Sequence, residues 1–330
     1  MIQHKNIHDI DKKTLLDKVQ ESQMSENLLE MKETERDEVG GAGGASPAPS
    51  PRNLSQKRTK NKKTLKKLKT EEVNKSLQIE KEALLLNYIH QMNTNTFENI
   101  VRDLRGNKLK DYLSSMKKLT SLQKEVLVGI MLGDGNIQSN GGKNFFFKFD
   151  QKAINHDYVS LVYLIFQQFV GTHPKLRLVN GIAHSWWFRT YRLSCFKFFH
   201  DQFYGLDAHG QSVRIVPKLL HRWITPISLA FWFMDDGAMQ PYGYALHTQC
   251  FQLHQVKDLQ KLLGNKFGLE TSIQSDTKKS TRKTYYFLYI SSRSIQRFNS
   301  LVRPFILPCM LYKLHPDKET SSSEPQSNGT

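Results

Sequence analysis

"LVGIMLGDG", from Leu127 to Gly135, and "LAFWFMDDG", from Leu229 to Gly237, are two apolar stretches that both end in an aspartate followed by glycine. The two aspartates, Asp134 and Asp236, are 102 residues apart. A single Asp-Gly pair is a common helix end, because glycine readily adopts the left-handed conformation there. Two copies with the same apolar lead-in indicate a repeated feature of the chain and a function for both acids.

The sequence around the two stretches repeats in the same order. Each stretch ends a predicted helix, and the first of these helices has Thr120 as its N-cap candidate. The spacing of apolar residues then predicts a strand, a helix, two strands and a helix. These elements are expected in the first half at 144–150, 154–169, 174–179, 184–192 and 194–204, and in the second half at 243–249, 253–267, 269–275, 284–291 and from about 292.

This repeat predicts an α+β fold of two halves, each reading helix–strand–helix–strand–strand–helix, related by a pseudo-twofold axis. The two apolar helices are the natural contact between the halves. Gly129 and Gly133 lie on one face of the first helix and allow its backbone to approach the second closely. Such a central two-helix interface would bring Asp134 and Asp236 together near the axis.

The formal net charge of +16 is unevenly distributed along the chain. Residues 1–50 carry −4, residues 51–118 carry +10 and residues 119–314 carry +12. A polyanionic partner is therefore expected. Nucleic acid is favoured over a membrane, because no apolar run reaches the roughly eighteen residues that span a bilayer. Cys195, Cys250 and Cys309 are widely spaced and give no basis for a disulfide framework or a structural zinc site.

Composition divides the chain into four parts. We expect a polar and basic extension at 1–118, largely disordered or loosely helical, then a first half at 119–212, a second half at 213–316 and a disordered tail at 317–330. Within the extension, residues 40–51 form a flexible linker by composition. The basic run at 57–69 favours a solvated segment, with a nucleic-acid-binding arm as the alternative. The N-terminus has no hydrophobic signal core, and its early aspartates are untypical of an organelle transit peptide.

The repeat also includes two basic residues. "RIVP" places Arg214 three residues before Pro217, and "KLHP" places Lys313 three residues before Pro316. Each half thus supplies one carboxylate and one cation. Adjacent carboxylates repel each other outside bulk water, and a divalent cation with oxygen ligands offsets this repulsion. We expect the two motif aspartates to bind Mg²⁺, since no histidine or cysteine cluster favours a softer metal, and a scissile phosphate to complete its shell.

"ITPISLAFWFMDDG" (224–237) resembles a signature phrase of one branch of the LAGLIDADG homing endonuclease family, and "FILPCMLYKL" (305–314) resembles the C-terminal segment of that branch. The chain is similar to the single-chain, two-motif form of the family over about residues 119–314. The resemblance implies that Asp134 and Asp236 are catalytic acids and that Arg214 and Lys313 are the basic active-site residues. It further implies two saddle-shaped antiparallel sheets over the DNA major groove, and site-specific, Mg²⁺-dependent double-strand cleavage.

Two departures from the family pattern affect the expected site. Phe231 and Asp235 stand where the motif prefers small residues, so the helix contact is expected to be looser or rearranged. Arg214 stands where the family pattern has lysine. Arginine stays protonated, so it would hold a phosphate or orient a water and would not act as a base.

Polar residues on the outward faces of the predicted strands are candidates for contacts with base edges. These candidates are Lys148, Asp150, Arg189, Arg192, His247 and Gln249. Lys143 and Lys152 are expected to contact phosphates, which position the protein without reading sequence. Trp186 and Trp187 are expected in the core.

Three functions are compatible with these features. The first is an intron-encoded DNA endonuclease, acting as a monomer on double-stranded DNA in a mitochondrion or chloroplast and encoded in the organelle. The alternative is an RNA maturase that binds its host intron RNA with reduced or no cleavage, and the basic segment 52–118 fits that role. A non-catalytic DNA-binding module comes third, because both acids are retained. No membrane partner and no organic cofactor are expected.

Overall fold

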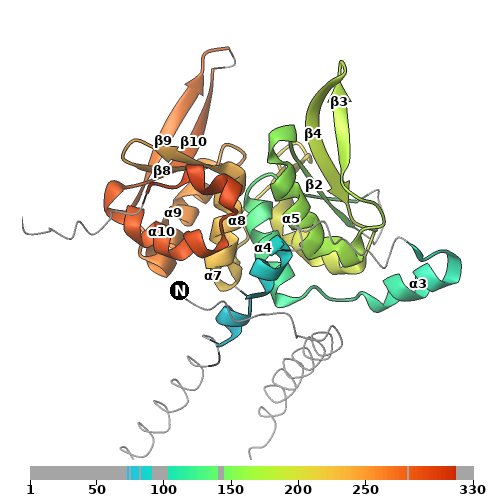
Figure 1. Ribbon diagram of the computed structural model, residues 1–330. Helices are drawn as coiled ribbons and strands as arrows, with labels where there is room; N and C mark the ends of the chain where they lie inside the picture. The colour runs from blue at the N-terminus through green and yellow to red at the C-terminus, as the bar shows by residue number, and fades with distance from the viewer. Residues whose placement is uncertain are drawn as a thin grey trace, which may run out of the picture. The chain divides into compact units, whose positions relative to one another are not determined.

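The computed structural model describes residues 73, 76–81, 83–90, 103–139, 145–280 and 282–316. The two motif helices, α4 (Ser121–Leu132) and α8 (Pro226–Asp236), pack side by side between the two halves (Figure 1). Thr120 is the N-cap of α4, as the sequence predicts, and it forms a capping box with Gln123. At the start of α8, the Thr225 hydroxyl accepts a hydrogen bond from the Ser228 amide.

Each half contains a four-stranded antiparallel sheet, and the strand orders are β1-β2-β4-β3 and β7-β8-β10-β9. The bounds of the strands are β1 Asn136–Gln138, β2 Phe146–Lys152, β3 Lys175–Val179, β4 Ile182–Arg189, β7 Gly237–Gln240, β8 Gly243–His247, β9 Thr271–Lys278 and β10 Lys283–Ile290. The equivalent order confirms the predicted duplication. The sequence prediction missed β1 and β7, because strands this short carry too little alternation to recognise.

Helices cover one face of each sheet, and the long hairpins β3–β4 and β9–β10 rise on the same side of the α4–α8 pair (Figure 1). The remaining elements are α3 Gly106–Ser115, α5 His156–Phe166, α6 Lys197–Phe203, β5 Tyr204–Leu206, β6 Ser212–Arg214, α7 Leu220–Trp223, α9 Leu253–Phe267 and α10 Ile295–Val302. The helix expected at 154–169 is shorter in the structure, since 3₁₀ turns replace both of its ends. The short β5–β6 hairpin joins the two halves and was not predicted.

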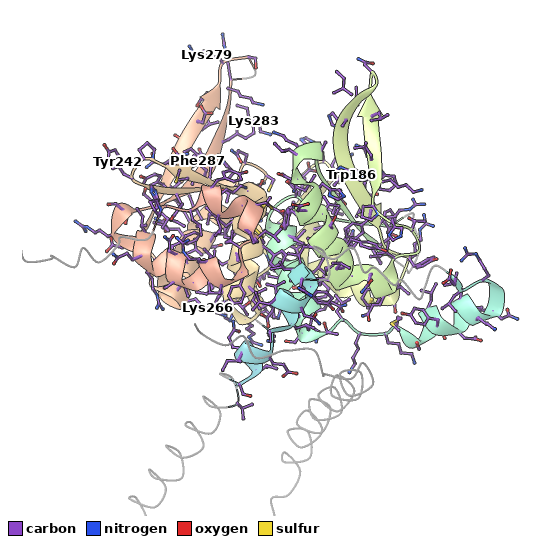
Figure 2. The ribbon with its side chains drawn as sticks, viewed as in Figure 1. Trp186, Tyr242, Lys266, Lys279, Lys283 and Phe287 are labelled. Carbon is purple, nitrogen blue, oxygen red and sulfur yellow. The ribbon has the colours of Figure 1, made fainter. Side chains whose placement is uncertain are left out.

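Alternation along β2 places Phe147 and Phe149 in the core. Both are 0% exposed, and Tyr244 and Leu246 occupy the equivalent places on β8 with the same burial. Full burial of such a side chain stabilises the fold by about 1.5–3 kcal/mol. The inward faces of the two sheets are therefore fixed by apolar burial, and the outward faces are left for other contacts. Side chains on the two long hairpins can be followed in Figure 2, where Trp186 marks β4 and Phe287 marks β10.

The contact between α4 and α8 matches glycines on one helix with larger residues on the other. A Cβ atom on Gly129 would lie 2.3 Å from the Ser228 carbonyl oxygen and 3.0 Å from the Phe231 Cβ. A Cβ on Gly133 would lie 2.5 Å from the Cβ of Asp235. The contact is thus rearranged without being loosened, because the glycines of α4 make room for Phe231 and Asp235.

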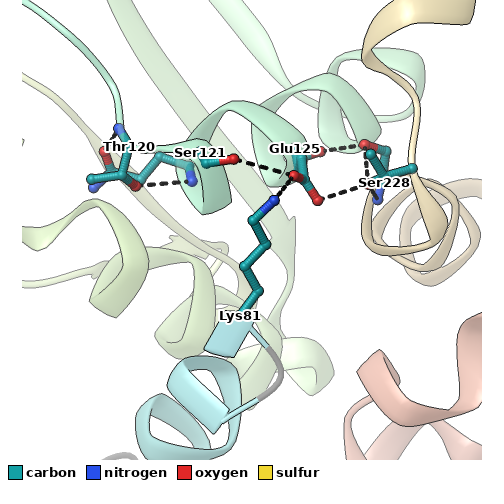
Figure 3. Close-up of polar contacts among 7 residues, drawn as sticks. Lys81, Thr120, Ser121, Glu125 and Ser228 are labelled. Atoms are coloured by element: carbon teal, nitrogen blue, oxygen red, sulfur yellow. Dashed lines mark hydrogen bonds and ion pairs between the residues drawn. The ribbon is translucent and has the colours of Figure 1, made fainter. Parts of the chain in front are cut away.

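Part of the extension packs on the core. The described residues between 76 and 90 are helical, and Leu85 among them is 1% exposed within the core cluster. Lys81 Nζ lies 2.5 Å from Glu125 Oε1, and Glu125 Oε2 accepts a hydrogen bond of 2.8 Å from the Thr225 hydroxyl (Figure 3). The composition of 1–118 led us to expect loose structure here, since large apolar residues are few. Leu85, the partly buried Leu84, Tyr88 and Ile89, and the Lys81–Glu125 ion pair together dock this segment.

Several expected features lie outside the described residues, namely the linker at 40–51, the basic run at 57–69 and the tail at 317–330. In the part of the chain that the structure does describe, no helix has the length and apolar character needed to cross a membrane.

Candidate active site

The two motif helices end differently, and neither ends in the left-handed conformation. α4 stops at Leu132 with Gly133 as its C-cap at φ −105°, whereas α8 continues through Asp236 to Gly237 at φ −91°. The glycines after the aspartates are required by close packing. A Cβ on Gly135 would lie 2.4 Å from Ile130 Cγ2, and a Cβ on Gly237 would lie 2.0 Å from a Phe233 ring carbon. The ordinary role of Asp-Gly as a left-handed helix stop therefore does not apply.

A third carboxylate, Asp235, lies beside Asp134. The Asp134 backbone amide donates a hydrogen bond of 3.2 Å to Asp235 Oδ2. Gln151 Nε2 donates to both acids, at 2.7 Å to Asp134 Oδ2 and 3.3 Å to Asp235 Oδ1. Gln151 Oε1 in turn accepts a hydrogen bond of 3.2 Å from Asn155 Nδ2. The amide of Gln151 thus joins the end of one motif helix to that of the other.

Gln151 was not among the predicted site residues, and Asp235 was expected to matter only through its size in the helix contact. Gln151 lies on the inward face of β2, with Phe147 and Phe149, and is 7% exposed. A polar residue at a buried position of an alternating strand was the available signal. Buried polar groups need partners, and for Gln151 the partners are the acids at the helix ends.

Burial and mutual repulsion make it unfavourable for the clustered aspartates to carry their negative charges. Burial raises the pKa of Asp236 to about 7, and the charge of Asp134 acts in the same direction, while Arg214 and Lys313 oppose the shift. Burial and the charge of Asp134 likewise raise the pKa of Asp235 well above its usual range. The site is therefore built to receive positive charge.

Arg214 and Lys313 occupy corresponding places at the ends of the two motif helices. The Arg214 guanidinium, at the end of β6, donates to the carbonyl oxygens of Met131, Gly133 and Gly135 around the end of α4. Lys313 Nζ donates a hydrogen bond of 2.6 Å to the Met234 carbonyl oxygen near the end of α8. A cation at a helix C-terminus is favoured by the helix dipole.

The two cations differ in character. Burial lowers the pKa of Lys313, although the nearby charges of Asp235 and Asp236 oppose this shift. Arg214 instead holds its guanidinium carbon 5.8 Å from the centroid of the Tyr204 ring. A lysine with a lowered pKa can exchange a proton, whereas arginine acts only as a fixed positive charge.

The predicted DNA-contacting residues of the first half lie on the outward face of its sheet. Asp150 is paired with Lys148 at 3.1 Å and with Arg177 at 3.0 Å. Although burial works against it, the neighbouring positive charges of Lys148 and Arg177 lower the pKa of Asp150. Its acceptor capacity is thus used within the sheet. Lys152 is exposed at the end of β2.

The other predicted contacts are distributed over both halves. Arg189 and Arg192 are exposed and lie over the Phe146 ring, with their guanidinium carbons 5.9 and 5.4 Å from its centroid. Gln249 Nε2 and His247 Nδ1 are 3.0 Å apart at the end of β8. Lys143 lies outside the described residues. The structure therefore places these groups at two sheets and leaves their roles as predictions.

The expectation that both tryptophans lie in the core is right for Trp186 and wrong for Trp187. Trp186 packs against the core cluster. Trp187 pairs with Asp150 on the outward face, where the ammonium groups of Lys148 and Lys175 lie 5.6 and 5.9 Å from its ring centroid. Consecutive residues of a strand point to opposite faces, so one of the two had to face outward.

Known proteins are similar to this chain in sequence and in architecture. The chain is 32% identical over 221 residues to probable intron-encoded endonuclease 1 of Wickerhamomyces canadensis, covering 62% of this chain and 89% of that protein. It is 29% identical over 209 residues to DNA endonuclease I-ChuI of Chlamydomonas applanata, covering 59% and 95%. A solved structure, the homing endonuclease I-WcaI bound to its DNA recognition sequence, is similar with a TM-score of 0.56 and 29% identity over 68% of this chain and 97% of that one.

A second kind of relative is also present. The chain is 27% identical over 241 residues to the cytochrome b mRNA maturase bI2 of Saccharomyces cerevisiae, covering 70% of this chain but only 56% of the maturase. Residues 124–298 match the LAGLIDADG DNA endonuclease family. Because this match takes in more than half of the 330 residues, the chain belongs to the LAGLIDADG DNA endonuclease family.

Proposed function

We propose that the protein is a site-specific DNA endonuclease that hydrolyses both strands of a long target duplex. The observation that carries this proposal is the convergence of Asp134, Asp235 and Asp236 at the ends of two closely packed helices, with Arg214 and Lys313 beside them. Acids and cations gathered at one point are what in-line attack on a phosphodiester requires.

A divalent cation fits the donor set of this site. Asp134 and Asp236 offer oxygen ligands; burial and then the charge of Asp134 raise the pKa of Asp236, and a cation would offset the repulsion between these two carboxylates. Among the described residues, no three histidine, cysteine or acidic side chains are grouped so as to hold a metal ion by themselves. Mg²⁺ is our choice because it prefers few carboxylates together with substrate phosphate oxygens. When bound, such an ion polarises the phosphate and lowers the pKa of a bound water.

The protein's own residues would position the reacting groups. Gln151 orients the Asp134 carboxylate through its hydrogen bond of 2.7 Å. Lys313, with its lowered pKa, is suited to take or give a proton. Arg214 would hold the end of α4 in place and contribute a fixed positive charge. The two strands of the duplex would thus lie near different basic residues, Arg214 at the end of α4 and Lys313 at the end of α8.

The two sheets would lie over the major groove of the target, with their outward side chains facing base edges. One chain supplies both acids, so a monomer is sufficient for cleavage of both strands. The likeness to a cytochrome b mRNA maturase supports an organelle, where we propose that an intron encodes the protein.

The second candidate function is RNA maturation, and it rests on two observations. The maturase relative aligns with 70% of this chain, and residues 51–118 add a net charge of +10 ahead of the first half. A maturase would bind its intron RNA with the acids unused. RNA binding that is unaffected by Asp134→Asn, in a protein that cuts no DNA, would favour this function.

Cleavage of a library of randomised duplexes in the presence of Mg²⁺ tests the proposed function. Wild-type protein is compared with Asp134→Asn and Asp236→Asn, and with Asp258→Asn as a control, because Asp258 is an exposed acid on α9. We expect double-strand cuts at one family of sequences, lost in the first two variants and retained in the control. If folded wild-type protein made no cuts, or if cutting survived in both active-site variants, the proposal would be wrong.

A further inference from the structure

The outward faces of the two sheets differ in chemistry, although their strand orders are the same. Residues paired across neighbouring antiparallel strands share a face, so the register defines each outward face. In the first sheet this face carries Phe146, Lys148, Asp150, Lys152, Lys175, Arg177, Ser185, Trp187 and Arg189, and the guanidinium groups of Arg189 and Arg192 cover the Phe146 ring. In the second sheet it carries Ala245, His247, Ser272, Gln274, Tyr285, Phe287 and Tyr289, with Asp276, Lys278 and Lys283 toward the hairpin tip.

A position-by-position comparison shows where charge is replaced by apolar surface. Asn136 and Ala238 both stand two residues after a motif aspartate, and they pair with Lys148 and Ala245 respectively. Lys148 therefore corresponds to Ala245. Along the same ladders, Arg189 corresponds to Tyr289, so an apolar side chain again replaces a charged one, whereas Trp187 corresponds to Phe287 and both are aromatic.

Tyr285, Phe287 and Tyr289 form a row along β10 on the face opposite the core. The residues between and beyond them point inward, and Leu288 and Ile290 are both 0% exposed. The row itself is only partly buried and lies outside the core cluster. We call these three residues the aromatic row.

Positive charge surrounds the outer end of the aromatic row. The ammonium groups of Lys278 and Lys283 lie 5.7 and 5.4 Å from the centroid of the Tyr285 ring. Figure 2 shows Lys283 and Phe287 on β10, below the hairpin tip that carries Lys279. An apolar row with a lysine rim is complementary to a groove that has apolar groups on its floor and phosphates on its edges.

In the major groove, the 5-methyl group of thymine is the apolar contact that a base pair offers, whereas arginine and lysine pair best with the O6 and N7 of guanine. We propose that the aromatic row reads thymine methyl groups, so that the half-site under the second half is A·T-rich while guanines are concentrated under the first half. This inference rests on the proposed function and adds the chemistry of its target.

Single-atom changes in the DNA test this inference without altering the protein. Deoxyuridine differs from thymidine only by the missing methyl group. Once the library has given a target, each thymine is replaced in turn by uracil, and the dissociation constant and cleavage rate are measured. Loss of one buried methyl contact should weaken binding about fourfold. We expect such losses in the second half-site and little change in the first.

Substitutions in the aromatic row separate base reading from a structural role. Phe287→Ser should remove the sensitivity to uracil under that position, while Phe287→Leu, which keeps an apolar contact, should retain it. Tyr286→Phe serves as the matched control, because Tyr286 packs against the core from the other face of β10. It should leave every uracil effect unchanged.

The outcomes distinguish this inference from the proposed function. The inference would be overturned if the protein cleaved a target whose second half-site contains no thymine, or if uracil at every position of that half-site left binding unchanged. Either result would leave the proposed endonuclease function standing. If the wild type cut nothing, binding selection with Asp134→Asn protein would be used to find a target for the same measurements. Failure to bind any duplex would overturn both.

Discussion

At the scale of single residues, the site depends on an amide placed among carboxylates. Gln151 donates to both Asp134 and Asp235, so it opposes repulsion that burial would otherwise make severe. The equivalent position in the second half is Thr248, whose hydroxyl donates instead to the Tyr286 carbonyl oxygen, away from the acids. The two halves thus carry different support for their motif aspartates.

Gln151→Leu should lower the single-turnover cleavage rate roughly ten- to hundredfold, because hydrogen bonds to charged groups are worth about 1.5–3 kcal/mol. The dissociation constant for the target should change little, since Gln151 is buried on the inward face of its sheet. Thr248→Val is the matched control and should leave the cleavage rate close to that of the wild type. Equal losses in both variants would contradict a specific role for Gln151.

Arg214→Lys should reduce stability as well as altering the site. The guanidinium serves three carbonyl oxygens around the end of α4, and an ammonium group of different shape leaves some of them without a donor. We expect the free energy of unfolding in urea to fall by about 1–2 kcal/mol. Arg222→Lys, at an exposed position on α7, should have no measurable effect. An unchanged unfolding midpoint in Arg214→Lys would show that these contacts contribute little.

At the scale of elements, the contact between α4 and α8 decides whether the acids meet. Gly129→Ala would place a Cβ 2.3 Å from the Ser228 carbonyl oxygen, a backbone atom that moves only if the helices separate. Overpacking of this kind costs about 1–3 kcal/mol, despite the higher helix propensity of alanine. Gly264→Ala on α9 is the matched control, because its Cβ would meet nothing closer than 3.8 Å.

We therefore expect urea unfolding to show a loss of stability for Gly129→Ala and a gain of up to about 1 kcal/mol for Gly264→Ala. Cleavage should fall in the first variant and be retained in the second. The prediction fails if both glycines tolerate alanine equally well.

Some helices and strands could be predicted from the sequence and others could not. The duplication, α4, α8 and α9 were predictable because long periodic segments report their burial directly. β1 and β7 were not, since three or four residues carry no usable period. The place of Gln151 depends on contacts 17 and 84 residues distant in sequence, and pattern alone gives no information on such contacts. The docking of Leu85 is likewise a tertiary effect that a local count of apolar residues missed.

At the scale of the whole molecule, one buried carboxylate joins three parts of the described chain. Glu125, on α4, is 8% exposed and is paired with Lys81 of the extension. It also accepts from the hydroxyl of Thr225, the N-cap of α8, and its backbone carbonyl accepts from Ser228 Oγ at 2.8 Å (Figure 3). The extension, the first half and the second half therefore meet at the opposite end of the helix pair from the motif aspartates.

Lys81→Met should destabilise the whole fold by leaving Glu125 buried without its cation. Loss of one partner from a buried pair costs about 3–5 kcal/mol, and the remaining hydroxyl donors should limit the loss to roughly 2–3 kcal/mol. Lys110→Met, at an exposed position of α3, is the matched control and should be neutral. If Lys81→Met and Lys110→Met unfolded at the same urea concentration, the extension would not contribute to the core. A selective loss in Lys81→Met, restored by Glu125→Gln in the same chain, would establish that the loss comes from the charge of Glu125 left buried without its cation.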